Sequence, residues 1–130
     1  MIDFTNSTIF KLKAVADDTL DSSVEPLLIE EEEIISTYKA FRDYVVFTNK
    51  RIIAVNVQGI TGTKKDFTSL PYSKIQVYSV ETAGAAESFI GIGADCELDL
   101  YFSGLGSVRF EFKHDMNIME ICKVISEYVL

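Results

Sequence analysis

The 130-residue sequence has no tryptophan, a single histidine, two cysteines and two prolines. The cysteines, Cys96 and Cys122, lie 26 residues apart in the chain, and neither has a second cysteine or a histidine close to it. A zinc site needs such pairs. The sequence therefore predicts two small buried thiols and no metal site.

Sets of residues that could carry out catalysis are also missing. His114 is the only histidine, and no nucleophile is paired with it by any recognisable spacing. Gly91 and Gly93 lack the third glycine of a dinucleotide-binding loop, and no glycine-rich phosphate loop joins a strand to a helix. The sequence predicts no enzyme activity, no catalytic residue and no cofactor.

Long apolar runs and an excess of positive charge are absent as well. No run approaches the roughly 18–20 residues of a membrane span, and the first residues do not resemble a signal peptide. These features predict a cytoplasmic protein. The 12 basic and 20 acidic residues give a net charge of −8. This balance argues against nucleic-acid binding and against simple electrostatic adhesion to an anionic membrane.

What the chain does contain is typical of one globular domain. Apolar residues make up 48% of it, including nine Phe and six Tyr. In residues 1–30, Ser7 or Thr8 is a candidate N-cap for a short helix, followed by a polar linker at residues 17–26. The four acidic residues at 30–33 are predicted to be a solvated face or strand rim. We therefore expect an N-terminal helix and linker over 1–30, and the main domain over 31–130, in one structural unit.

From residue 34 onward the pattern predicts strands. Runs of β-branched and aromatic residues indicate seven of them, over residues 34–41, 43–48, 51–57, 63–70, 74–82, 97–102 and 107–113. Asn49 and Lys50 separate two of these runs and predict a two-residue turn, with Asn49 as the residue that tolerates a left-handed conformation. The result is an antiparallel β domain.

The last two strands alternate so regularly that their register can be predicted. Both apolar sets must face the core, because a slip of one residue turns a whole strand over. Pairing Leu100 with Val108 meets this condition and pairs Leu98 with Phe110. The same register sets Asp99 opposite Arg109 on the solvated face.

A helix should close the chain. Asp115 is a candidate N-cap, and the apolar residues that follow have the spacing of one buried helical stripe: Ile118, Ile121, Cys122, Ile125, Tyr128 and Val129. The sheet is the available partner for this stripe. Seven strands and one helix predict a rolled antiparallel sheet, or partly open barrel, whose open end is covered by the helix.

At residues 33–53 the chain reads Glu-Ile-Ile-Ser-Thr-Tyr-Lys-Ala-Phe-Arg-Asp-Tyr-Val-Val-Phe-Thr-Asn-Lys-Arg-Ile-Ile, and residues 70–75 read Leu-Pro-Tyr-Ser-Lys-Ile. Together with Gln-Gly-Ile-Thr-Gly-Thr-Lys-Lys at 58–65 and Val-Glu-Thr-Ala-Gly at 80–84, this resembles the bacterial pleckstrin-homology (PH) domain family from about residue 30 to the C-terminus. The resemblance implies a seven-stranded PH-like roll with a C-terminal helix. It also implies small cytoplasmic proteins of no established activity that assemble as homo-oligomers, often rings. After Gly84 the chain departs from the family pattern.

Two groups of residues are candidate contacts. The eukaryotic relatives of this fold bind phosphoinositides through a basic loop, which corresponds here to the segment containing Lys39 and Arg42. This segment is short and ends in an acid. Lys50 and Arg51 form a second basic pair, either solvated or in contact with a partner.

The segment from Ala83 to Ala94 sets Phe89, Ile90 and Ile92 among glycine and alanine residues. Three interpretations remain open for these apolar side chains: a strand entering the core, a subunit or partner contact, or a contact with a membrane surface. Exposed apolar residues that gather together usually mark an interface.

The leading hypothesis is a non-catalytic module that self-associates, as a homo-oligomer that could be a ring, and docks a protein partner. Exposed strand edges could pair between subunits or accept a peptide as an added strand. Binding to a membrane surface or lipid headgroup is the less favoured alternative, and a small-ligand or enzymatic role comes third.

Overall fold

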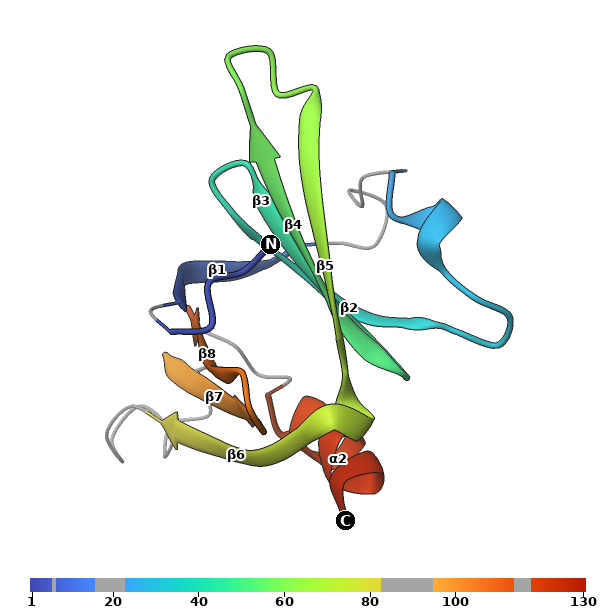
Figure 1. Ribbon diagram of the computed structural model, residues 1–130, viewed down its shortest axis with the longest axis vertical. Coiled ribbons are helices and arrows are strands. Elements are labelled where there is room, and N and C mark those ends of the chain that lie inside the picture. The colour runs from blue at the N-terminus through green and yellow to red at the C-terminus, as the bar shows by residue number, and fades with distance from the viewer. Residues whose placement is uncertain (6, 16–22, 83–94, 114–117) are drawn as a thin grey trace.

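The computed structural model describes residues 1–5, 7–15, 23–82, 95–113 and 118–130, with side chains for all of these except 7–11. Its eight strands form one curled sheet, in the order β5-β4-β3-β2-β1-β8-β7-β6. Figure 1 shows the sheet bending into a half-barrel, with helix α2 (Ile118–Val129) at one end. The predicted β architecture with a C-terminal helix is confirmed.

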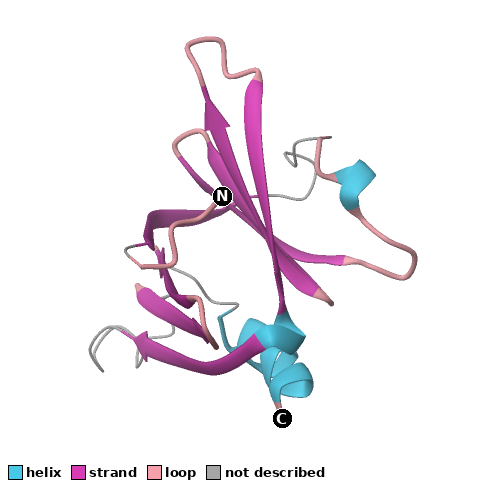
Figure 2. Cartoon of the chain, viewed as in Figure 1, coloured by secondary structure: helices cyan, strands magenta, loops and turns pink. Residues whose placement is uncertain are grey.

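All seven predicted strands are present, with bounds within one residue of those expected. They are β2 (Ile34–Ala40), β3 (Asp43–Thr48), β4 (Arg51–Gln58), β5 (Lys64–Pro71), β6 (Ile75–Thr82), β7 (Cys96–Phe102) and β8 (Gly106–Phe112). Two short 3₁₀ turns, η2 (Glu25–Leu27) and η3 (Tyr72–Lys74), complete the described elements. In Figure 2, η3 lies with α2 at one end of the sheet, whereas η2 lies apart from both.

The predicted N-terminal helix is wrong. Residues Ser7–Val15 form an eighth strand, β1, which pairs antiparallel with β2 and parallel with β8. The sheet is therefore mixed. Strands β2 and β8 each have an edge that needs hydrogen-bond partners, and pairing with them outweighs the weak local tendency of this segment to form a helix. The alternation Phe10-Lys11-Leu12-Lys13 suits a strand, and Leu12 is fully buried.

The predicted register of the last hairpin is confirmed. Leu100 pairs with Val108, and Asp99 pairs with Arg109. The Arg109 guanidinium donates to both carboxylate oxygens of Asp99, at 2.7 and 3.0 Å. These hydrogen bonds, with the negative charges of Asp99 and Glu97, raise the pKa of Arg109. The pair lies on the solvated face, as the alternating pattern requires.

Residues 1–5 run across the concave side of the sheet, from β5 to the β7–β8 turn. The Ile2 N–H donates to the Thr68 hydroxyl at 3.3 Å, and the Phe4 carbonyl accepts from the Ser107 N–H at 3.0 Å. The Phe4 ring meets the edge of Phe102, with centroids 5.7 Å apart. Gly106 has a φ of +122°, and a Cβ there would lie 2.4 Å from the Phe4 carbonyl oxygen. The close approach of these segments requires glycine.

Two apolar clusters hold the sheet. The larger fills the concave side, where a group of aromatic rings meets the apolar stripe of α2; its rings include Tyr38, Phe47, Phe110 and Phe112. The smaller lies on the convex side of β3 and β4, covered by Val24 and Leu28. In α2 the buried residues are Ile118, Ile121, Cys122 and Ile125, four of the six predicted, whereas Tyr128 is 43% exposed. The candidate cap Asp115 lies outside the described residues.

Cys96 and Cys122 are buried thiols, as predicted. No helix among the described residues is long and apolar enough to cross a membrane.

Candidate binding surfaces

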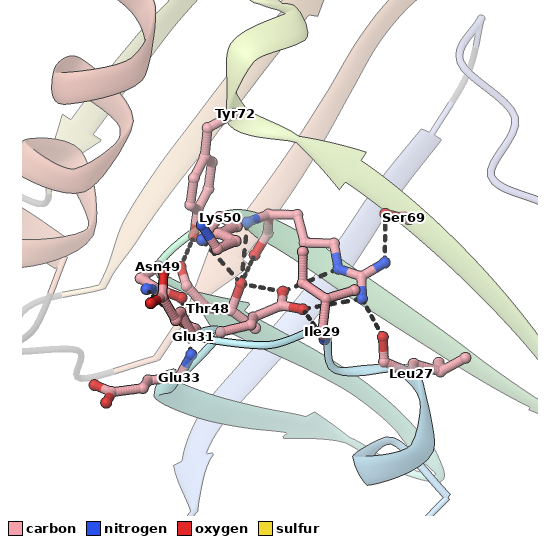
Figure 3. A network of polar contacts seen from close by, with 11 residues as sticks. Leu27, Ile29, Glu31, Glu33, Thr48, Asn49, Lys50, Ser69 and Tyr72 are labelled. Carbon is pink, nitrogen blue, oxygen red and sulfur yellow. Dashed lines mark hydrogen bonds and ion pairs between the residues drawn. The ribbon is translucent and has the colours of Figure 1, made fainter.

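A buried ion pair lies where the β3–β4 turn meets the segment before β2 (Figure 3). The Glu32 side chain has no exposed surface, and the Arg51 side chain is 21% exposed. Arg51 Nε and Nη2 donate to the two carboxylate oxygens of Glu32 at 3.0 and 3.1 Å. This paired geometry is the strong arrangement for an arginine and a carboxylate.

Other residues form hydrogen bonds with the donor and acceptor capacity of Glu32 and Arg51 that the ion pair itself does not use. The Thr48 hydroxyl donates to Glu32 Oε2 at 2.7 Å, and the Ile29 N–H donates to Oε1 at 3.0 Å. Arg51 also donates to the Ser69 hydroxyl at 3.1 Å and to the Leu27 carbonyl. Each charge of the pair therefore has several partners, which is the condition for burying it without a large penalty.

The turn at residues 49–50 places Glu32 in this network. The two-residue turn is present as predicted, but Asn49 does not have a positive φ. Its side chain instead accepts from the Glu33 N–H at 2.8 Å and donates to the Glu31 carbonyl at 3.0 Å. Glu31 has the left-handed conformation, with a φ of +65°. This turn points Glu32 into the protein, whereas Glu31 and Glu33 stay exposed.

Burial by itself would raise the pKa of Glu32. The hydrogen bonds from Arg51, Thr48 and Ile29, with the positive charge of Arg51, outweigh that effect and hold the pKa below its ordinary value of 4.5. Glu32 is thus a stable carboxylate. Nearby, burial raises the pKa of Tyr72, with smaller contributions from Tyr128 and Glu32. The Tyr72 hydroxyl donates to the Thr48 carbonyl at 2.7 Å. The cluster therefore holds its charges fixed, as a structural tie does, and has no group poised for proton transfer.

This arrangement separates the two basic residues of the predicted pair. Arg51 bonds within the chain. Lys50 is partly exposed, and its N–H donates to the Thr48 hydroxyl at 3.0 Å. Of the candidate contacts, Phe89, Ile90 and Ile92 lie outside the described residues, as do His114 and the glycine pair at 91 and 93.

Lys39, near the end of β2, and Arg42, in the β2–β3 turn, belong to one hairpin. The tip of this hairpin lies toward the end of the molecule opposite α2 (Figure 1). Lys39 Nζ lies over the Tyr44 ring, 5.2 Å from its centroid. Arg42 lies 5.9 Å from the Phe41 centroid, and its Nη1 donates to the Gly59 carbonyl at 2.7 Å. Because Gly59 belongs to the β4–β5 turn, Arg42 ties the two turns together.

Two exposed side chains at these tips were not predicted as contacts. Phe41 is 91% exposed, and Ile60, in the neighbouring turn, is fully exposed. Phe41 has a φ of +56° at the first position of a two-residue turn, where glycine is usual. The sequence does place an aromatic residue in this short turn, and that is the signal that could have identified it.

The two edges of the sheet differ in composition. β5 begins with Lys64 and Lys65 and ends with Pro71, and such residues discourage pairing with another strand. β6 has no lysine and no proline, and its only charged residue is Glu81, near its end. Among the described strands, none pairs with the outer edge of β6.

The solvated face beside the β6 edge carries apolar side chains. Val77 is 53% exposed and pairs across the sheet with Tyr101, which is 42% exposed. A shallow open hollow of 580 Å³ adjoins them, lined by residues that include Gln76, Tyr101 and Leu105. Within the part of the chain that the structure describes, no group of three or more acidic, cysteine or histidine residues is placed to hold a metal ion.

Comparison with known proteins agrees with this fold. The family described as Bacterial PH domain matches residues 3–129, so the chain belongs to that family. The uncharacterized Bacillus subtilis protein YjqA is 43% identical over 102 residues, which cover 77% of each chain. The uncharacterized protein YozO of the same organism is 29% identical, over 89% of this chain and 95% of YozO.

Solved structures give the same result. A protein with a pleckstrin-homology domain from Shewanella loihica is 34% identical, with a TM-score of 0.71 over 92% of this chain and 98% of the other. A pleckstrin-homology domain from Shewanella amazonensis is 37% identical, with a TM-score of 0.56 over 84% of each chain. The resemblance seen in the sequence is confirmed, and the fold is that of a binding module.

Proposed function

We propose that this chain is a non-catalytic, cytoplasmic binding module that self-associates through the β6 edge and docks a protein partner on the same fold. The observation that carries the proposal is the contrast between the two sheet edges. An open edge offers unpaired N–H and C=O groups to another strand, and proteins that stay monomeric usually block it with charge, proline or a bulge. β5 has lysines and a proline along its length, whereas β6 has a bulge only at its start, between Ile75 and Val77, and its residues from Val77 to Val80 have no charge and pair regularly with β7.

The side chains next to this edge support an interface. Val77 and Tyr101 are exposed on the same face, and the hollow at Gln76 and Leu105 continues that surface. Aromatic residues are enriched at the centre of protein interfaces. An added strand would gain main-chain hydrogen bonds from β6 and place alternate side chains on this apolar surface.

Pairing of β6 with β6 of a second copy gives a two-fold dimer, in which the same surface is used twice. A ring requires a head-to-tail contact between different surfaces, for example β6 of one copy with β5 of the next. The lysines and Pro71 of β5 oppose that contact. A ring therefore needs a further surface, for which Phe89, Ile90 and Ile92 remain candidates. Because this dimer occupies the β6 edge of both copies, a protein partner that adds a strand to β6 would compete with self-association.

Light scattering coupled to size-exclusion chromatography tests the proposal. We expect the wild-type protein at tens of micromolar to have a mass of at least twice the 14.6 kDa of one chain. Val77→Lys places a lysine on the open edge and should give monomers. Phe67→Lys is the matched control, since Phe67 is 38% exposed on the edge strand that is already blocked. A monomeric wild-type protein, or equal effects of the two lysines, would contradict the proposal. Circular dichroism establishes that both variants are folded.

A further inference from the structure

The solvated face of β6, β7 and β8 carries its side chains in rows that run across the three strands. The register sets Glu81 opposite Glu97 and Glu97 opposite Glu111, so three glutamates follow one another across the sheet. Two rows along, Val77 lies opposite Tyr101. At the β6 edge this face therefore ends in an acidic position at Glu81 and an apolar position at Val77, four residues apart on one side of the strand.

The glutamate row lacks positive charge. Like charges directly opposite each other destabilise a sheet, and β6, β7 and β8 together contain four acidic residues and one basic residue, Arg109. Arg109 belongs to the next row, where it lies 2.7 Å from Asp99 and 3.4 Å from Glu97. Glu81 is exposed at the edge, and it forms no ion pair with any described residue. A positive charge placed beside Glu81 would therefore stabilise this face.

A second copy of β6 does not supply that charge. In an antiparallel pair of β6 strands that keeps the solvated face continuous, the residue opposite Glu81 comes from the same face of the other copy, because side chains alternate along a strand. None of the eight residues of β6 is basic. Self-association through this edge thus leaves Glu81 without an opposite charge, whereas a strand of different sequence could provide one.

We propose that the protein partner of the β6 edge is a basic strand, with a lysine or arginine opposite Glu81 and an apolar or aromatic residue four positions away, opposite Val77. This inference rests on the proposed function, since it names the kind of strand that the open edge binds. Main-chain hydrogen bonds hold an added strand whatever its sequence, and the side chains give selectivity. The net charge of −8 also favours encounter with a basic segment.

The partner and the second copy then exclude each other. The bulge of β6 lies before Val77, and from there to Thr82 the strand keeps a regular register with β7. A partner that reaches from Val77 to Glu81 needs about five residues, the length of an ordinary strand. Because a two-fold dimer uses this segment in both copies, a bound basic strand releases the second copy. Partner binding thereby controls self-association.

The absence of tryptophan from the chain makes binding of a tryptophan peptide directly visible. The probe is the synthetic peptide acetyl-Thr-Lys-Val-Thr-Val-Trp-Thr-amide, which antiparallel to β6 sets its lysine opposite Glu81 and its tryptophan opposite Val77. One control peptide has threonine in place of the lysine. A second exchanges the lysine with the valine after it, which keeps the composition and moves the lysine to the other face. On binding, the tryptophan emission should shift to shorter wavelength.

Peptide titrations give the expected selectivity. The lysine peptide should bind the wild-type protein about fivefold more tightly than either control peptide. Glu81→Gln should abolish this preference and leave the affinity for the threonine peptide nearly unchanged. Glu30→Gln is the matched control, because it makes the same change of charge at an exposed glutamate before β2, away from β6 (Figure 1), and it should keep the full preference. Val77→Lys should weaken the binding of all three peptides.

Light scattering tests the exclusion. Saturating lysine peptide should lower the mass of the wild-type protein to that of one chain with one peptide, and circular dichroism establishes that each variant is folded. An unchanged mass at saturation would show that the partner does not displace the second copy, which contradicts a shared edge.

The outcomes separate this inference from the proposed function. Equal binding of the three peptides, no peptide binding, or a preference that survives Glu81→Gln would overturn the basic partner, even where Val77→Lys still turns a dimer into monomers. A monomeric wild-type protein that prefers the lysine peptide, and loses the preference in Glu81→Gln, would instead contradict self-association and support the basic partner.

Discussion

Replacing Arg51 with methionine should destabilise the protein more than replacing Glu32 with glutamine, because the two partners of the ion pair differ in exposure. In Arg51→Met the Glu32 carboxylate remains fully buried with two donors, from Thr48 and Ile29. An unpaired buried charge typically costs 3–5 kcal/mol. Since two hydrogen bonds remain, we expect a loss of about 3 kcal/mol in the free energy of unfolding.

Glu32→Gln leaves the Arg51 guanidinium without its carboxylate partner, but this group is less buried than Glu32 and keeps other hydrogen-bond partners. Arg51 is 21% exposed and still donates to the Ser69 hydroxyl and the Leu27 carbonyl. The glutamine oxygen can also still accept one hydrogen bond. We expect a loss of about 1.5 kcal/mol, typical of a weakened hydrogen bond to a charged group. The double variant should lose less than the sum of the two, since neither charge is then left alone.

Urea unfolding followed by circular dichroism at neutral pH measures these differences. With a denaturant dependence of about 1.5 kcal/mol per molar urea, the midpoint should fall by about 2 M in Arg51→Met and by about 1 M in Glu32→Gln. Arg109→Met is the matched control, because that arginine pairs with Asp99 at the surface and should leave the midpoint nearly unchanged. If Arg51→Met costs no more than Glu32→Gln, or if the control costs as much, the reasoning from burial is wrong.

Two further predictions follow from the same structure. The folded state holds the pKa of Glu32 below its ordinary value of 4.5. The contribution of Glu32 to stability should therefore be present above that value and be lost as the pH falls through the lower folded-state pKa. Urea midpoints should fall less steeply with acidification in Glu32→Gln than in the wild type. Gly106→Ala should lower the free energy of unfolding by more than 2 kcal/mol, because its Cβ would lie 2.4 Å from the Phe4 carbonyl oxygen. In Gly104→Ala the Cβ meets no atom within 4 Å, so this variant should lose only about 1 kcal/mol, for its positive φ. Equal costs at the two glycines would contradict the close approach of residues 1–5 to the β7–β8 turn.

Much of the sheet could be predicted because its strands carry their own pattern. In β7 and β8 the side chains alternate between core and solvent, so the register follows from keeping both apolar sets on one face. The same holds for the stripe of α2. These are local periodicities, and they need no knowledge of what lies next to each element.

The ion pair between Glu32 and Arg51 could not be predicted, because its formation depends on contacts between distant segments of the chain and not on a local periodicity. The four glutamates at 30–33 are identical in type, and only the turn at Glu31 and the bonds from Asn49 decide that Glu32 faces inward. Arg51 was singled out as basic, but its partner lies 19 residues earlier in the chain. No periodicity links the two. The exposure of Phe41 and Ile60 likewise depends on where the hairpin tips end in space.

The incorrect assignment of residues 7–15 bears directly on function. Without β1, strands β2 and β8 would each have an open edge, and self-association would have four candidate edges. With β1 between them, the described strands form one continuous sheet whose edges are β5 and β6 alone. β5 carries lysines and a proline, so the eighth strand narrows the choice to β6. The β6 sequence suggests a strand and nothing more; it becomes a candidate interface only because the order of strands leaves it unpaired and its composition leaves it unblocked.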